Sequence, residues 1–141
     1  MLKTFFKKYF KLILVTGESM TPTLKNNQHV LVKKTKKLKR GDIVLFRWEN
    51  RLLIKRLIAM PNDMLSSNDR GVFLNDYRLH EPYISAHATH TPFECKISPA
   101  RIFVMGDNRL DSVDSRHPLV GEVGLDDVIG RVILLPLCHL F

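Results

Sequence analysis

The segment LLIKRLIAM, at residues 52–60, follows a second apolar segment, DIVLFRW, at residues 42–48. Both are short, rich in Val, Ile, Leu and Phe, and bounded by Gly, Asn or Pro, which is typical of β-strands. Because such segments recur at close spacing, we expect a mostly-β single domain of short, largely antiparallel strands. The others are HVLV (29–32), GVFLND (71–76), RIFVMG (101–106) and VIGRVILL (128–135).

Turn-forming residues separate several of these strands. Asn75 and Asp76 lie between apolar residues and predict a tight hairpin turn. Residues 80–100 contain three prolines and little periodicity, which predicts a loop or irregular excursion. We expect the hairpin and the excursion to occupy residues 64–103 within the same domain.

Positive charge is concentrated at one end of the chain. The 141 residues carry a formal net charge of +8 and are long enough for one domain with a modest core. Residues 1–40 contain 11 of the 22 Lys and Arg but a single acid, Glu18, whereas the remainder carries about −2. This asymmetry predicts an acidic partner for the N-terminal third, such as phospholipid headgroups or nucleic acid.

The first 15 residues, MLKTFFKKYFKLILV, combine lysines with apolar side chains at helical spacing. This pattern predicts a basic amphipathic segment, residues 1–12, at a membrane interface; a solvated helix packed on its own domain is the alternative. A membrane span needs about 20 apolar residues, and no segment is that long, so no transmembrane helix is expected. The apolar positions are Leu2, Phe5, Phe6, Tyr9, Phe10 and Ile13.

A second basic segment, KKTKKLKR, occupies residues 33–40. Clustered lysines bind nucleic-acid phosphates through charge, but binding of single strands also uses aromatic side chains on which bases stack. No aromatic residue lies within this segment. We therefore interpret it as a solvated hairpin or a lipid-facing edge, and expect no nucleic-acid partner.

The segment GESMTPTL, at residues 17–24, groups three hydroxyl side chains around a glycine and a proline. No histidine lies within it, so a nucleophilic hydroxyl there needs another proton acceptor. Lys55 is a candidate because Leu53 and Leu57 flank it on one face of its strand. Burial among leucines lowers the pKa of an amine and lets it act as a general base. The alternative is an amine that snorkels to solvent.

Residues 104–121, VMGDNRLDSVDSRHPLVG, contain polar partners for such a lysine. Ser112, Asp114 and Arg116 alternate, which places them on one side if the segment is extended. A hydroxyl and an ion pair there would orient the amine, as the third group orients the base of a catalytic triad. A solvated loop is the alternative. Arg56, on the opposite strand face from the lysine, is expected to be solvated.

Together these segments resemble the type I signal peptidases, which are membrane-bound serine–lysine proteases. GESMTPTL resembles the nucleophile box of that family, IKRLIAMPND (54–63) the lysine box and FVMGDNRLDSVDSR (103–116) the final box. RGDIVLF (40–46) and VFLNDYRLHEPYI (72–84) resemble the strand box and the linking hairpin. The segments follow the order of the family, and the resemblance implies a largely β catalytic domain over residues 13–141.

By this resemblance, the chain is a serine endopeptidase that removes signal peptides through an acyl-enzyme. Ser19 would be the nucleophile and Lys55 the general base. Ser112 would hydrogen-bond the lysine amine, while Asp114 and Arg116 would pair to brace it. No metal or organic cofactor is implied.

Two neighbours of the serine are expected to shape the substrate site. The backbone N–H of Ser19 is the natural oxyanion donor. Some family members carry a serine at the position of Gly17 and gain a second donor from it, which glycine does not offer. Met20 is expected to line the substrate groove or the apolar surface.

The resemblance also implies a partner and a location. Substrates would be preproteins with small residues before the cut, and the catalytic domain would face the extracytoplasmic side of a membrane. Most members have a transmembrane helix before the nucleophile box. This chain is therefore expected to be held by its amphipathic N-terminus or by a partner, or to be a soluble relative that matures one dedicated precursor.

Other interpretations are weaker. The self-cleaving SOS-type repressors also use a serine–lysine dyad, but they cut an Ala-Gly or Cys-Gly bond in their own chain, and neither dipeptide occurs here. A catalytically silent relative acting in assembly is disfavoured by the presence of both dyad residues. His87 and His90 lack a third ligand of clear spacing, so no metal site is predicted. Cys95 and Cys138 could be free or paired.

Overall fold

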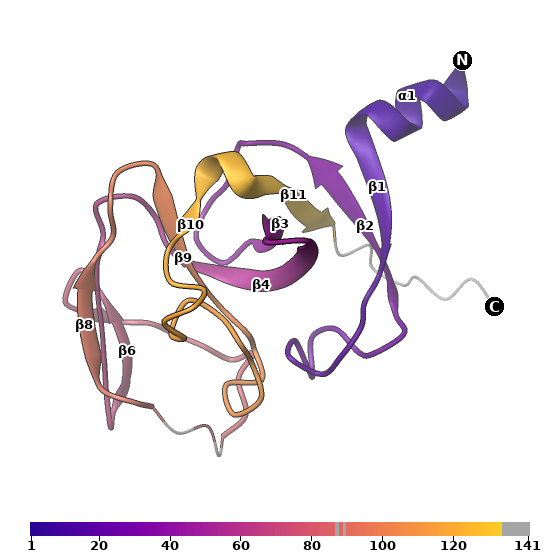
Figure 1. Cartoon of the computed structure of the whole chain (residues 1–141). Helices are drawn as coiled ribbons and strands as arrows, with labels where there is room; N and C mark the ends of the chain where they lie inside the picture. Colours follow the sequence, from indigo (N-terminus) through magenta and orange to yellow (C-terminus); the bar gives the residue numbers. More distant parts are fainter. Residues whose placement is uncertain (87, 89, 134–141) are drawn as a thin grey trace.

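The computed structural model describes residues 1–86, 88 and 90–133. Within these residues the chain forms one α-helix, one short 3₁₀ helix and two antiparallel sheets of seven and four strands (Figure 1). The larger sheet has the order β1-β2-β11-β3-β4-β9-β10, and the smaller one has the order β7-β6-β5-β8. The predicted fold class, a mostly-β chain of short antiparallel strands, is confirmed.

The larger sheet contains the first and the last strand of the described chain. Its strands are β1 (Phe10–Leu14), β2 (His29–Lys34), β3 (Ile43–Trp48), β4 (Arg51–Ala59), β9 (Arg101–Met105), β10 (Val123–Gly124) and β11 (Val128–Ile133). The helix α1 (Leu2–Tyr9) precedes β1, and the 3₁₀ helix η1 (Leu125–Asp127) precedes β11. The smaller sheet consists of β5 (Met64–Asn68), β6 (Gly71–Leu74), β7 (Tyr77–Arg78) and β8 (Phe93–Lys96).

The strand β4 connects the two halves of the larger sheet. It pairs with β3 from Trp48↔Arg51 to Ile43↔Arg56, and with β9 from Arg56 onward. The neighbouring β3 is buried on both faces over residues 43–46, which explains its uninterrupted apolar sequence. The middle of β4 is therefore held rigidly inside the molecule, and that is where the predicted general base lies.

Apolar side chains form three packed clusters. One lies under β1, β2 and β11, a second lies between β3, β4 and β9, and a third joins the smaller sheet to β9. The third cluster includes Leu65, Val72, Ile97 and Phe103, all of them buried. Because burial of apolar area is the main stabilising term in folding, these shared clusters fix the smaller sheet against the larger one.

The six strands expected from the sequence all form, with boundaries shifted by a few residues. Asn75 and Asp76 join β6 to β7 with φ values of 49° and 70°, so the hairpin turn is also confirmed. The excursion is less irregular than expected, because β8 forms within it by pairing with β5. A short strand between prolines has little periodicity of its own and depends on its neighbour.

The N-terminal helix ends earlier than the apolar pattern suggested. It ends at Tyr9, and the following residues form β1 instead of continuing the helix to Ile13. β1 pairs with β2 along its whole length. These backbone hydrogen bonds and the partial burial of Phe10, Lys11 and Ile13 favour the strand over one more turn of a short helix, which is marginal in water.

The helix α1 leaves its apolar side chains in solvent. None of its eight residues is buried, and it extends away from the two sheets (Figure 1). No helix among the described residues has the length and apolar character needed to cross a bilayer. The exposed apolar face of α1 is therefore a surface feature that core packing does not explain.

Gly130 marks the closest approach of β11 to β2. A Cβ atom there would lie 2.0 Å from the backbone oxygen of Lys33, which is closer than any non-bonded contact allows. We expect Gly130→Ala to lower the free energy of unfolding by roughly 1–3 kcal/mol, because the strands must separate. Thermal unfolding followed by circular dichroism measures this loss.

The control is Gly124→Ala, whose Cβ would meet only the flexible carboxylate of Asp127, at 3.3 Å. It should unfold close to the wild-type temperature. Equal stability of the two variants would contradict the close packing at Gly130.

Candidate active site

Ser19 and Lys55 come from distant segments and lie next to each other in the structure. Ser19 lies in the turn after β1, and Lys55 lies on β4. The lysine Nζ is 2.8 Å from the serine Oγ, although 36 residues separate them. This hydrogen-bonded pair is the centre of the candidate site.

The Lys55 side chain is enclosed by apolar groups, and the residue is only 4% exposed. Leu53 and Leu57 belong to the apolar cluster on its face of β4, and Val44 pairs with it from β3. The alternative in which the amine snorkels to solvent is therefore wrong. Burial lowers the pKa of Lys55, and the negative charge of Asp114 offsets only part of this effect. An amine with a lowered pKa that contacts a hydroxyl is a candidate general base.

The turn that carries Ser19 is held by its own polar groups. Gly17 has a φ of +86°, in the region that favours glycine, and its N–H donates to Asn26 Oδ1 at 2.9 Å. The carbonyl oxygen of Glu18 accepts hydrogen bonds from the N–H and the hydroxyl of Thr21, at 3.1 and 2.9 Å. Within the described residues the N–H of Ser19 donates to no protein group, so it is available to a ligand.

The loop after β9 contacts this turn directly. Asn108 donates from its N–H to the carbonyl of Ser19 at 3.0 Å and from its side-chain amide to the carbonyl of Glu18 at 3.2 Å. Gly106 packs so tightly that a Cβ there would lie 2.6 Å from the Ser19 carbonyl oxygen and 2.2 Å from the Ser112 hydroxyl. Only glycine allows this approach, which brings the loop against the nucleophile turn.

Arg56 joins β4 to the same loop through Asp107, and Asp107 in turn contacts the nucleophile segment. Its guanidinium makes two hydrogen bonds to Asp107, at 2.8 and 2.6 Å, and lies 3.9 Å from the centre of the Tyr83 ring. Asp107 is fully buried and also accepts a hydrogen bond from the Thr23 hydroxyl. The expectation that Arg56 is solvated is wrong, because its carboxylate partner lies 51 residues away in the sequence and only folding brings them together.

The three expected supporting residues form one hydrogen-bonded group around a buried carboxylate. Asp114 accepts two hydrogen bonds from the Arg116 guanidinium, at 2.9 and 2.8 Å, and one from the Arg116 backbone N–H at 3.2 Å. It also accepts one from the Ser112 hydroxyl at 2.7 Å and one from the Gly106 N–H at 2.8 Å. Burial opposes ionisation of Asp114, but the Arg116 guanidinium and these hydrogen bonds outweigh it and hold its pKa below the ordinary value.

One expected contact is not formed. Among the described residues, the Lys55 amine hydrogen-bonds only to Ser19, and the hydroxyl of Ser112 donates to Asp114 instead. A carboxylate is the stronger acceptor because its hydrogen bonds are charge-assisted. Asp114 therefore acts on the lysine through its charge, and Ser112 acts on Asp114.

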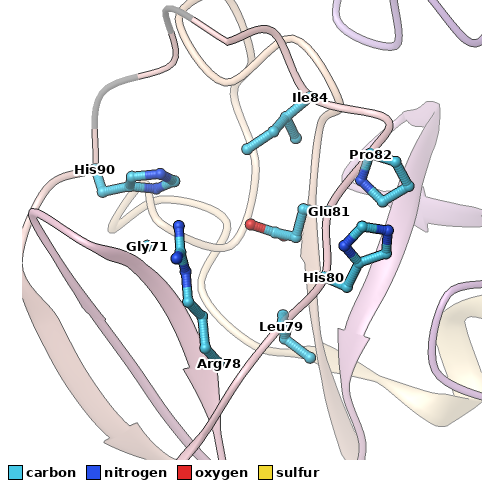
Figure 2. Close-up of a pocket in the computed structure, with 8 residues that line it drawn as sticks. All are labelled: Gly71, Arg78, Leu79, His80, Glu81, Pro82, Ile84 and His90. Carbon is cyan, nitrogen blue, oxygen red and sulfur yellow. The ribbon is translucent and has the colours of Figure 1, made fainter.

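A further ion pair supports this loop and was not predicted. Arg109 and Glu81 lie 2.5 Å apart (Nη2 to Oε1), and both side chains are nearly buried. Arg109 also donates to the carbonyl of Gly106 at 3.0 Å. Figure 2 shows Glu81 beside a cavity of about 460 Å³ that Arg78 and His90 also line; the serine–lysine pair does not line it. Glu81 lies in the expected excursion, where no periodicity signals a structural role.

A cleft of about 290 Å³ opens beside the serine–lysine pair, between β1 and β4. Among the described strands β1 pairs only with β2, and β4 meets β9 only from Arg56 onward. Both strands therefore present unpaired backbone edges to the cleft. Met20, which is buried, forms part of its wall with Leu45 and Ile54.

The remaining candidates from the sequence do not join this site. Among residues 1–86, 88 and 90–133 there is no group of three or more His, Cys, Asp or Glu side chains that could hold a metal. Cys95 lies on β8 and is partly buried. His87 and Cys138 lie outside the described residues.

Comparison with known proteins agrees with this geometry. The sequence matches the family described as signal peptidase, peptidase S26, over residues 2–136. The chain belongs to this family. The resemblance inferred from the five motifs is confirmed, and the family membership supports assignment of this chain as a peptidase.

Similar members of the signal peptidase family come from several bacteria. The chain is 35% identical to signal peptidase I U of Bacillus subtilis (strain 168) over 137 residues, covering 86% of this chain and 73% of that one. It is 36% identical to a signal peptidase I of Bacillus licheniformis over 126 residues, covering 78% and 68%. A crystal structure of a signal peptidase I from Enterococcus faecalis V583 superposes with a TM-score of 0.62 and 27% identity, covering 69% of this chain and 97% of that one.

The buried ion pair between Arg56 and Asp107 generates a stability prediction for this signal peptidase family member. The Arg56 side chain is only 11% exposed, so Asp107→Asn leaves a buried cation without its counter-charge. We expect the free energy of unfolding to fall by about 3–5 kcal/mol, measured by urea denaturation.

The matched control is Asp111→Asn, the same substitution in the same loop, at an exposed position without an ion pair in the described structure. It should change stability by less than about 0.5 kcal/mol. A loss for Asp107→Asn as small as that of the control would show that the pair does not hold the loop.

Proposed function

We propose that this protein removes signal peptides from preproteins, with Ser19 as the nucleophile and Lys55 as the general base. The observation that carries the proposal is the 2.8 Å contact between a buried lysine amine and a serine hydroxyl at the end of a cleft. A lysine with a lowered pKa is needed at this position because no histidine is among the residues that line the cleft.

The reaction proceeds in two stages. Neutral Lys55 accepts the hydroxyl proton of Ser19 as Oγ attacks the scissile carbonyl carbon. The lysine then gives this proton to the departing amine, the C–N bond breaks, and an ester between the serine and the signal peptide remains. A water molecule that gives its proton to Lys55 next attacks the ester carbonyl, and the proton passes to Ser19 as the ester bond breaks.

The oxyanion of each tetrahedral intermediate needs hydrogen-bond donors. The N–H of Ser19 fits this role because it has no partner within the described structure. Gly17 has no side-chain donor, and its N–H is engaged with Asn26. Asp114, with Ser112 and Arg116 around it, is assigned a positioning role that holds the loop and sets the charge near the lysine.

The cleft suits an extended peptide with small side chains. The unpaired edges of β1 and β4 can each hydrogen-bond an inserted strand, as in recognition by β-strand addition. Apolar walls that include Met20 and Leu45 restrict the room for side chains, which agrees with small residues before the cut. Leu12, Leu14 and Leu52 line the same cleft and are exposed.

These exposed leucines and the apolar face of α1 support action at a membrane surface. An apolar rim of this kind is typical of membrane or protein contact. We assign the catalytic domain to the extracytoplasmic face, where exported preproteins present their signal peptides.

The dyad is tested by cleavage of a synthetic peptide that contains an Ala-X-Ala site. Ser19→Ala and Lys55→Ala should each lower kcat/KM by at least about 10³-fold, because one removes the nucleophile and the other its base. Thr21→Ala removes a neighbouring hydroxyl and should retain most activity. Equal activity of Ser19→Ala and the parent would reject the proposed nucleophile.

The pH dependence tests the role of Lys55. Activity should rise with pH as the amine loses its proton, with a midpoint below the ordinary pKa of lysine. Asp114 raises the pKa of Lys55 through its charge, so Asp114→Asn should move the midpoint to lower pH. The check is the dependence of kcat/KM on pH, measured for wild type and for Asp114→Asn protein shown to be folded. A shift of the midpoint to higher pH in the variant would contradict the expected direction.

A further inference from the structure

A groove of about 570 Å³ lies between α1 and the larger sheet. Four basic side chains line it, one each from α1, β1, β2 and β3: Lys7, Lys11, Lys34 and Arg47. Lys34 donates from its amine to the carbonyl of Lys7 at 2.7 Å and so joins β2 to α1. No carboxylate lines the groove, and within the described structure none of the four cations is in an ion pair.

The rest of the groove wall is apolar. Phe6 and Phe10 stack with ring centres 5.3 Å apart, and Leu12 and Ile129 complete the surface. Four neighbouring cations repel one another unless an anion lies among them. A small inorganic anion would satisfy the charge and leave the apolar wall in water, whereas an anionic amphiphile matches both halves of the groove.

Exposed apolar side chains lie on α1 and β1, the two elements that contribute most of the groove wall. Leu2 is 83% exposed, Phe5 is 59% exposed and Leu12 is 63% exposed. Solitary exposed apolar residues are common, but these lie on one helix and the adjoining strand, as in proteins that rest in a lipid interface. A nucleic acid would neutralise the cations but leave these apolar side chains exposed to water. A lipid, which offers both a charged headgroup and apolar chains, is therefore the better match.

The groove adjoins the end of the cleft that lies away from the dyad. The two cavities share Leu12, and the serine–lysine pair lies at the other end of the cleft. β1 and β4 run in the same direction, because the pairs that connect them through the sheet are all antiparallel. A lipid headgroup in the groove would therefore place the bilayer surface at the distal end of the cleft.

We propose that this groove binds the phosphodiester headgroup of one anionic phospholipid among its four cations, with the start of an acyl chain along Phe6, Phe10 and Leu12. The proposal builds on the proposed function, because the bound lipid sets the height of the cleft above the bilayer. It assigns Lys34 and Arg47, on the sheet, to membrane recognition together with the N-terminal segment.

Vesicle binding tests the site with the full chain. Vesicles of phosphatidylcholine alone are compared with vesicles of equal parts phosphatidylcholine and phosphatidylglycerol, by sedimentation. The Lys34→Gln/Arg47→Gln variant should bind the anionic vesicles roughly thirtyfold more weakly than wild type, since each basic residue near the surface contributes roughly five- to sixfold. The control, Lys37→Gln/Lys39→Gln, removes two positive charges from the basic segment 33–40 at positions that do not line the groove, and its binding should fall much less.

Further measurements distinguish a specific lipid site from general electrostatic attraction to an anionic surface. A water-soluble, short-chain phosphatidylglycerol should bind wild type with one-to-one stoichiometry, and inorganic phosphate should not displace it. Equal losses in the two double variants, or full displacement by inorganic phosphate, would overturn the lipid site. Tighter binding of a single-stranded oligonucleotide that is lost in the groove variant would instead identify a nucleic-acid site and also overturn it.

Cleavage assays keep this proposal separate from the proposed function. The groove variant should cleave the soluble Ala-X-Ala peptide like wild type but process a vesicle-embedded preprotein more slowly. Normal peptide cleavage without any preference for anionic vesicles would reject the lipid site and leave the peptidase intact. Absence of peptide cleavage in wild type would reject the proposed function, whatever the vesicles show.

Discussion

The contact between the Lys55 amine and the Ser19 hydroxyl sets the main constraint on this molecule. An amine beside a serine is useful as a base only when it is neutral, and burial favours that form by lowering its pKa. The apolar cluster around β3, β4 and β9 therefore has two roles. It stabilises the sheet, and it provides the dry surroundings that the proposed chemistry needs.

Three buried or partly buried arginine–carboxylate pairs hold the loops against this core. Arg56–Asp107, Arg109–Glu81 and Arg116–Asp114 each contribute a contact to the loop after β9. Buried ion pairs give little net stability because both charges lose their hydration, but loss of one partner is costly. Their value here lies in geometry, since they hold flexible loop residues within hydrogen-bond distance of the nucleophile turn.

Features of the fold and of the site could be predicted from the sequence where their determinants are local. The position of Lys55 between Leu53 and Leu57 made it a candidate for a buried amine, although an amine that reaches solvent fits the same spacing, and Asn75–Asp76 indicated a hairpin. By contrast, the partners of Arg56 and Arg109 lie far away in the sequence, and Glu81 belongs to a stretch without periodicity. The sequence pattern of β1 resembled a helix because alternate strand residues and helical positions overlap in so short a segment.

The amino-acid sequence by itself determined the strand-rich class, the hairpin and the order of the motifs, because period-two patterning and turn chemistry act over a few residues. Ser19 and Lys55 stood out as a pair only through the resemblance of those motifs to the signal peptidases. Only the tertiary structure decided that β1 is a strand, that Ser112 donates to Asp114 instead of to Lys55, and that Lys34 and Arg47 share a groove with α1. Each of these depends on sheet pairing and on competition among acceptors, and such contacts exist only after distant segments have packed together.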